Sequence, residues 1–227
     1  MGLIPEQELV RQIVGSHHTR AHVLNVHGFP KDPAWKFEVP LVTVPGPERR
    51  GDIDLLVWNR HRPEAAVAME VKRFKADVTG SGEDEVNKLK EFEKGVRQAN
   101  RLAEIGFSQI CLLILVLVDS RQQNIDSIRA GKTTYEGMDS RLRARVSSTI
   151  STAGLAKRVS LMEIEYIQAT DDRPIFGVGA SDEHIRRLEM AIEQPDAVTQ
   201  RVNGLIPDGG WGHKAVARRA AQEDRLA

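Results

Sequence analysis

Apolar and polar positions repeat with two different periods along this chain. Over residues 5–14 and 84–104, apolar side chains recur every three or four positions, which predicts two amphipathic helices. Strands are predicted where apolar and β-branched residues alternate or run together, over residues 35–44, 52–59, 64–74 and 108–119. The run from Ile110 to Val118 is apolar throughout, which indicates a central strand covered on both faces.

The second half of the chain continues the pattern less regularly. Residues 120–138 are polar and are predicted to be loop. Further elements are predicted as a helix over 139–157, strands over 159–169 and 175–180, and a helix from Ser181 through Gln194. After Pro195 the pattern is weak. We therefore expect one domain over residues 1–195 and a C-terminal tail or appendage over 196–227, dispensable for the core fold.

The order of these elements predicts an α/β fold with a mixed sheet. The short RHRP connection joins strands 52–59 and 64–74 into an antiparallel hairpin. The helix over 84–104 and the strand after it form a crossover connection, which makes the later strands parallel. Helices are therefore expected to cover both faces of the sheet.

Composition limits the kinds of partner. The 227 residues include 32 basic and 32 acidic side chains, so nucleic-acid binding would need a local basic patch or a partner protein. The single cysteine, Cys111, lies in an apolar run and cannot form an internal disulfide, which fits a reducing cytoplasm. The first residues lack a signal-peptide pattern, and the longest apolar run is too short to cross a bilayer. A cytoplasmic location without membrane attachment is expected.

The chemistry is concentrated in the predicted hairpin. Alternation along a strand places Glu70 and Lys72 on one face, and a turn centred on Arg62 places Asp54 opposite Glu70. Two facing carboxylates destabilise a sheet unless they are compensated. A hard divalent cation such as Mg²⁺ or Mn²⁺ would compensate them, since it prefers carboxylate and carbonyl oxygens. An ordinary surface ion-pair cluster is the alternative.

These residues resemble a known signature. GDID followed on the next strand by EVK is similar to the motif of the PD-(D/E)xK nuclease superfamily, and the resemblance covers residues 4–119. The opening EQELVRQIV resembles the first helix of Holliday-junction resolvases, with Glu6 on its inward face and Glu8 off it. Gln98 begins QANRL, which resembles the glutamine motif of recombination nucleases, although Leu102 replaces their usual tyrosine.

The resemblance implies a fold and a mechanism. The fold would be a restriction-endonuclease-like mixed sheet with an αβββαβ core flanked by helices. The activity would be hydrolysis of phosphodiester bonds, with DNA as the expected substrate in repair, recombination or defence. Asp54, Glu70 and the carbonyl of Val71 would hold Mg²⁺ or Mn²⁺, and Lys72 would neutralise the charge that develops on the phosphate. Glu6 would position a water or a second metal, and Gln98 would orient Lys72 or the scissile phosphate.

Basic residues near the motif are candidates for contact with a nucleic-acid backbone. They are Arg60, Arg62, Arg73 and Lys75. Two alternatives stay open. The protein could form a homodimer or receive the nucleic acid from a partner protein, or it could be a catalytically silent module of this fold that binds nucleic acid or serves in assembly. Residues 130–134, AGKTT, lack the first glycine of a phosphate-binding loop. The histidines over 17–22 lack the cysteine or carboxylate spacing of a zinc site.

Overall fold

The computed structural model is built around a mixed β-sheet. It describes residues 4–15, 33–40, 52–59, 61–76, 82–118, 125–132, 140–167, 175–179 and 192–205. Within these ranges the strands are β1 (Pro33–Pro40), β2 (Asp52–Asn59), β3 (Arg62–Ala76), β4 (Gln109–Val118), β5 (Val159–Ile167) and β6 (Ile175–Gly179). They form a six-stranded sheet in sequence order, parallel between β3, β4 and β5 and antiparallel elsewhere. The predicted mixed α/β sheet is confirmed.

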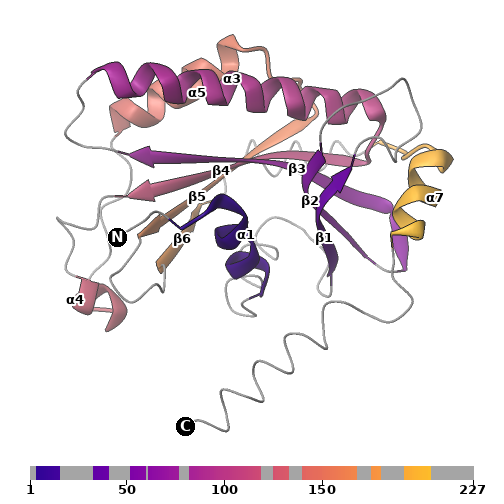
Figure 1. The fold of residues 1–227 in the computed structure, drawn as a ribbon, viewed down its shortest axis with the longest axis horizontal. Coiled ribbons are helices and arrows are strands. Elements are labelled where there is room, and N and C mark those ends of the chain that lie inside the picture. Colours follow the sequence, from indigo (N-terminus) through magenta and orange to yellow (C-terminus); the bar gives the residue numbers. More distant parts are fainter. Residues whose placement is uncertain are drawn as a thin grey trace, which may run out of the picture.

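Helices cover both faces of this sheet. The described helices are α1 (Glu6–Gly15), α3 (Gly82–Ile105), α4 (Ile125–Arg129), α5 (Ser140–Thr152) and α7 (Asp196–Gly204). Figure 1 shows α3 and α5 side by side on one face and α1 on the opposite face. The apolar positions of α1 are its buried positions, Leu9, Val10, Ile13 and Val14, so amphipathic spacing decides which side of this helix meets the sheet. No described helix has both the length and the apolar character needed to span a membrane.

The core consists of two layers separated by the sheet. The larger layer lies between the sheet and α3, α5 and α7, and the smaller layer lies under α1. Along β4, Leu112 and Ile114 belong to the larger layer, whereas Cys111 and Leu113 belong to the smaller one. The strand is therefore central and covered on both sides, as its apolar run predicts. Complete burial raises the pKa of the Cys111 thiol to about 12, which keeps it protonated and unreactive.

The β2–β3 hairpin has the predicted register beside the motif. Leu55 pairs with Met69, and the register continues through Leu56 and Val57 with Ala68 and Val67 as their partners. Closer to the turn the register shifts, so that Asn59 pairs with Arg62. Between these pairs β2 advances two residues and β3 advances five, so the ladder between the motif and the turn is irregular rather than uniform.

Several element boundaries differ from the predictions. The helix α4 lies within residues 120–138, which were expected to be loop. The helix expected through Gln194 does not reach that residue, since 192–195 are not helical, and its expected start at Ser181 lies outside the described residues. The helix expected over 139–157 ends at Thr152. Apolar spacing reports which face of an element is buried, but it fixes the ends poorly.

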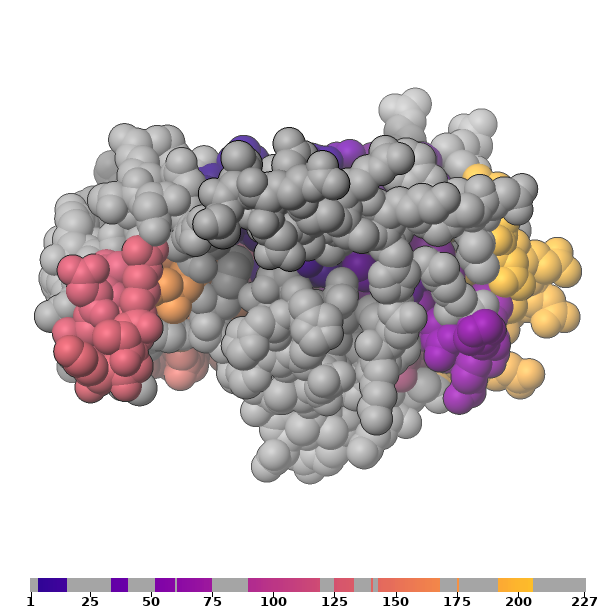
Figure 2. Space-filling model, turned by 90° about the horizontal axis from the view of Figure 1, so that it is seen from below, coloured from indigo at the N-terminus to yellow at the C-terminus, as the bar shows by residue number. Residues whose placement is uncertain are grey.

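Residues 196–205 contribute buried side chains to the core, although the predicted domain ends at residue 195. Val198, Val202 and Leu205 are buried in the larger layer, where α7 packs against β3. Viewed from below, α7 lies at the opposite end from α4 (Figure 2). The residues beyond 205, which include the rest of the expected tail, lie outside the described part of the chain.

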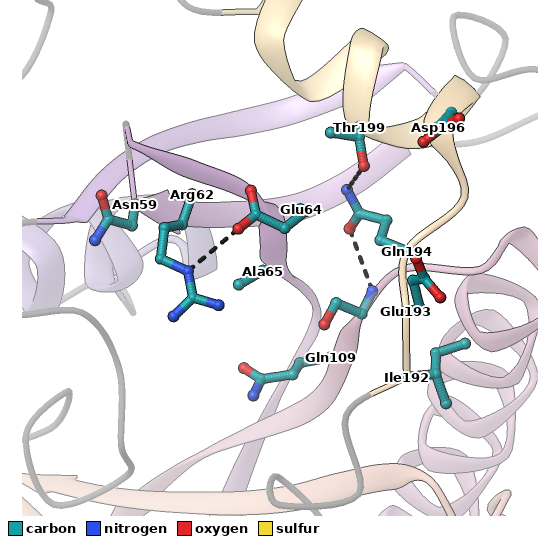
Figure 3. Close-up of a pocket in the computed structure, with 11 residues that line it drawn as sticks. Asn59, Arg62, Glu64, Ala65, Gln109, Ile192, Glu193, Gln194, Asp196 and Thr199 are labelled. Atoms are coloured by element: carbon teal, nitrogen blue, oxygen red, sulfur yellow. Dashed lines mark hydrogen bonds and ion pairs between the residues drawn. The ribbon is translucent and has the colours of Figure 1, made fainter.

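A buried glutamine explains why the chain is extended before α7. Gln194 is only 4% exposed. Its Nε2 donates to the Pro63 carbonyl at 3.0 Å. Its Oε1 accepts from the Ser108 backbone N–H at 3.2 Å, and its Nε2 also donates to the Thr199 hydroxyl at 3.1 Å (Figure 3). One amide thus joins β3, the start of β4 and α7. The satisfied bonds allow a polar side chain to be buried there.

Candidate active site

The hairpin opens at Asp54. The recorded pairing of β2 with β3 ends at Leu55 and Met69. Residues 53 and 55 of a regular strand would share a face, yet Ile53 packs in the larger core layer and Leu55 in the smaller one. On the neighbouring strand Glu38 has a φ of 48° and no recorded partner in the ladder. The regular backbone pairing of β2 with β3 thus ends where both β1 and β2 are irregular.

The Asp54 carboxylate, rather than a backbone carbonyl of β2, accepts a hydrogen bond from the backbone of β3. Its Oδ2 accepts a hydrogen bond from the backbone N–H of Val71 at 2.7 Å. A buried N–H without an acceptor would be costly, so this bond fixes the carboxylate against β3 as well as satisfying the strand. Asp54 is therefore held beside the residue that lies between Glu70 and Lys72.

The first turn of α1 lies beside the next part of β3. The guanidinium of Arg73 donates to the carbonyl of Ile4, and the backbone N–H of Arg73 donates to the Glu6 carboxyl. Glu6, Asp54 and Val71 line one small cavity of about 60 Å³. The cavity is polar and large enough to hold ordered water. Glu6 thus faces the hairpin as its helical spacing predicts, whereas Glu8 pairs with Arg11 on the outer side.

Glu70 and Lys72 lie on the face of β3 that α3 covers. The Glu70 side chain is 1% exposed and that of Lys72 is 13% exposed. The Lys72 Nζ donates to Glu70 Oε1 at 2.5 Å and to the carbonyl of Val71 at 2.9 Å. One ammonium thus contacts two of the three oxygen donors that the resemblance assigns to a metal.

A glycine in α3 makes room for the lysine stem. A Cβ added at Gly95 would lie 2.8 Å from Lys72 Cγ and 3.3 Å from Leu112 Cδ1. The first of these distances is shorter than carbon atoms tolerate, so a larger residue at position 95 would displace the lysine or the helix. Sequence reasoning missed this contact. Its signal was a glycine inside a helix, which costs about 1 kcal/mol relative to alanine and often has a packing reason.

The cluster has an excess of acidic groups. Burial raises the pKa of Glu70 to about 8, and the neighbouring Asp54 adds to this shift while Lys72 opposes it. Burial also raises the pKa of Glu6, and Asp54 adds to that shift too. Burial by itself lowers the pKa of Lys72, but the charges of Glu70, Asp54 and Glu6 outweigh it, so the pKa is raised. A single ammonium lies near three carboxyl groups, so an additional positive charge would stabilise their ionised forms.

The donor set fits a hard divalent cation. Asp54, Glu70 and the Val71 carbonyl supply oxygen atoms, which Mg²⁺ and Mn²⁺ prefer. The part of the chain that the structure describes has no ready-made group of three or more His, Cys, Asp or Glu side chains at metal-binding distances. The side chains would therefore supply only part of a coordination shell, and the carbonyl, water or a ligand would complete it. Mg²⁺ commonly keeps several waters in this way.

The other predicted site residues lie in different places. Gln98 is on α3, one turn after Gly95, and its Oε1 is buried without a hydrogen-bond partner. Arg73 bonds to Ile4 at α1, on the face opposite Lys72. Arg62 pairs with Glu64 at 3.2 Å and lies eight residues before Glu70 on β3. At about 3.3 Å per residue this separation is about 26 Å, so the expected gathering of Arg62 at the motif is not observed.

Arg60 and the side chain of Lys75 lie outside the described part of the structure. A second charged cluster lies elsewhere on the sheet, where Arg143 of α5 pairs with Glu165 at 2.5 Å and with Glu163 at 3.4 Å. These ion pairs account for Arg143, one of the basic residues of α5.

No family model matches the sequence, and no curated protein or solved structure matches it.

Proposed function

We propose that this protein is a metal-dependent nuclease that hydrolyses phosphodiester bonds, with DNA as its expected substrate. The observation that carries the proposal is the opening of the β2–β3 hairpin. There Asp54 is fixed by the Val71 N–H, and Glu70 is buried against the Lys72 ammonium. Two carboxylates and one lysine from adjacent strands supply both metal ligands and a cation for a phosphate.

Asp54, Glu70 and the Val71 carbonyl are the residues that would hold Mg²⁺ or Mn²⁺. A cation bound there would supply Lewis-acid polarisation of a phosphoryl group. The pKa of Glu70 is raised because burial and Asp54 disfavour its charge, and a ligand that neutralises this pair favours the ionised carboxylate. The Val71 N–H orients Asp54 before any ligand arrives, which limits the conformational cost of binding.

Lys72 would act on the phosphate directly. Its pKa is raised by the surrounding carboxylates, so the side chain is charged at neutral pH. Glu70 and the Val71 carbonyl now accept hydrogen bonds from the Lys72 ammonium. If these two groups held a cation instead, the ammonium would pair with a phosphate oxygen and neutralise the charge that develops during the reaction. Glu6, across the small cavity from Asp54, would orient the attacking water.

A cleavage assay tests the proposal. The protein is incubated with plasmid, linear duplex, single-stranded DNA and RNA in Mg²⁺, Mn²⁺ or EDTA. We expect cleavage with either metal and none with EDTA. Asp54→Asn and Glu70→Gln should abolish it, while Glu8→Gln, a matched change on the outer side of α1, should not. If no substrate is cleaved but nucleic acid is bound, the function is that of a catalytically silent module.

Metal binding can be measured without cleavage. A cation that binds only the folded protein stabilises it by about 2.7 kcal/mol at 100 times its dissociation constant. Mg²⁺ or Mn²⁺ should therefore raise the midpoint of thermal unfolding, and Asp54→Asn should remove this increase. Asp126→Asn, an exposed aspartate on α4, is the matched control and should keep it. An equal increase in both variants would contradict the assignment of the metal to Asp54.

A further inference from the structure

The second half of α3 carries a ridge of exposed basic residues. Between Lys94 and Ala103 each charged residue is basic, namely Lys94, Arg97 and Arg101, and all three are exposed. Spacings of three, four and seven positions place them along one side of the helix. Together with Gln98 they line a surface groove of about 380 Å³, which we call the α3 groove.

The α3 groove lies on the helix that also packs on Lys72. Lys94 directly precedes Gly95, whose backbone packs on the stem of Lys72. Lys94 and Arg101 are seven residues apart, which is about 10 Å along the helix axis. Phosphates of one strand recur about every 3.4 Å along a duplex axis, so a span of this length faces about three of them. A strand whose phosphate reaches Lys72 would therefore continue along the groove.

The groove also contains an unsatisfied polar atom. The Oε1 of Gln98 is buried and has no hydrogen-bond partner, whereas most buried polar atoms of proteins are paired. Because the Gln98 side chain lines the groove, rotation of its amide would bring this oxygen to a sugar hydroxyl or a base amine of a bound strand. The local charge favours the same class of ligand, because the protein is neutral overall and needs a local basic surface to bind a polyanion.

The ion pair between Arg97 and Glu93 is weak enough to be replaced by a phosphate. Arg97 lies 4.0 Å from Glu93, and the two side chains are 69% and 50% exposed. Exposed pairs of this kind contribute little, at most about 1 kcal/mol. A phosphate can therefore take the place of Glu93 at little cost, and it would bind the planar guanidinium with two parallel hydrogen bonds.

We propose that the α3 groove binds the sugar–phosphate backbone next to the scissile bond, through Lys94, Arg97 and Arg101. The location of the scissile bond rests on the proposed function, but backbone binding by the groove does not. Because the contacts are to phosphates, the groove should bind strands of different sequence similarly. The groove would contribute binding affinity, while Lys72 would neutralise the charge that develops on the phosphate.

The test compares two triple variants that lose equal charge. The first is Lys94→Gln/Arg97→Gln/Arg101→Gln. The control is Arg129→Gln/Lys132→Gln/Lys157→Gln, which changes three exposed basic residues at the end of α4 and before β5. Binding of labelled single-stranded DNA, duplex DNA and duplex RNA is measured by fluorescence anisotropy in EDTA over a range of salt concentrations. Circular dichroism checks that both variants are folded.

We expect the groove variant to bind more weakly and to reduce the slope of log Kd against log salt by about 2 to 3, because each lost phosphate contact removes about 0.9. The control should keep the slope of the unmodified protein. The arm with the largest change identifies the strand type that the groove binds. Equal slopes for the two variants, or no nucleic-acid binding by the unmodified protein, would overturn the proposal.

Cleavage separates this inference from the proposed function. In the groove variant KM should rise while kcat at saturating substrate stays close to that of the unmodified protein. Loss of binding in the groove variant of a protein that cleaves nothing would support the groove and reject the nuclease. Cleavage with an unchanged KM in the groove variant would support the nuclease and reject the groove.

Discussion

Lys72 is the residue on which the chemistry of the candidate site most depends. Its ammonium contacts Glu70 and the Val71 carbonyl, and its stem lies under Gly95. Binding of a metal uses the oxygen donors, whereas stabilisation of a phosphate uses the ammonium. Changes at this position can therefore separate metal binding from catalysis.

Lys72→Met keeps the aliphatic stem and removes the charge. We expect metal binding to be largely retained, because an ammonium is not a metal ligand, while the cleavage rate falls by about 10² or more, as for the loss of one electrostatic stabiliser. Calorimetry with Mn²⁺ and single-turnover cleavage measure the two effects. Lys90→Met, an exposed lysine of α3, is the control. Cleavage by Lys72→Met at the original rate would reject the assignment of the site.

Gly95→Ala tests the contact between α3 and Lys72. The new methyl group would lie 2.8 Å from Lys72 Cγ, so the lysine must shift. We expect kcat to fall by about 10²-fold, since displacements of about 1 Å in an active site can cost this much. The helix itself gains about 1 kcal/mol in propensity, which offsets part of the lost stability.

The matched change is Gly204→Ala, where an added Cβ would meet nothing within 4 Å. It should leave kcat unchanged. Thermal unfolding of both variants distinguishes a local displacement from loss of the fold. An unchanged kcat in Gly95→Ala would show that the position of the lysine stem does not limit catalysis.

At the scale of elements, α1 reaches the site because its first turn bonds to β3. Arg73 donates to the Ile4 carbonyl, and the same residue offers its backbone N–H to Glu6. The contacts are possible because the part of β2 before Leu55 is not paired with β3. The place of Glu6 therefore depends on a bond between α1 and a strand far away in the sequence.

Arg73→Met removes this bond and keeps the length of the side chain. We expect kcat to decrease because Glu6 is held less firmly, while the salt dependence of nucleic-acid binding stays the same. This outcome differs from the sequence-based expectation that Arg73 contacts the nucleic acid, which would reduce the salt slope by about 1. Anisotropy and steady-state cleavage decide between the two roles, and Arg11→Met on the outer side of α1 is the control.

At the scale of the whole molecule, α7 closes one end of the larger core layer. Two of its apolar residues and the adjoining Leu205 are buried there, and Gln194, just before the helix, bonds to β3 and to the residue that precedes β4. This junction borders an open pocket of about 670 Å³ whose lining mixes Arg62 with Glu64, Glu193 and Asp196 (Figure 3). We interpret the segment as structural, because the buried amide of Gln194 is satisfied within the protein.

Truncation after Gln194 tests that interpretation. It removes Val198, Val202 and Leu205, each worth about 1.5–3 kcal/mol when fully buried, from a fold whose total stability is expected to be about 5–15 kcal/mol. We expect the truncated chain to be unfolded or strongly destabilised in urea titrations. A chain that ends after Leu205 should keep the stability of the full chain. Equal stability of all three chains would support the predicted domain boundary at residue 195.

Much of the fold and part of the site could be predicted from local patterns. Alternation predicted β2 and β3 and placed Glu70 and Lys72 on one face. The register that pairs Leu55 with Met69 was predicted from a turn centred on Arg62, whereas the structure reaches it through a register shift near the turn. Helical spacing placed Glu6 on the inner side of α1. These features follow from backbone geometry, since strands and helices have fixed periods that a sequence displays directly. The nuclease assignment stays a prediction.

The remaining features depend on contacts between distant segments. The bond from the Val71 N–H to Asp54 arises where two strands separate, and the contact of Gly95 with Lys72 arises where a helix crosses a strand. The weak pattern after Pro195 concealed a helix whose few apolar residues fill one end of the core. Residue types and periods by themselves determined the elements and the faces they bury. Which side chains meet was decided only in the tertiary structure, because close packing selects partners by shape across the whole molecule.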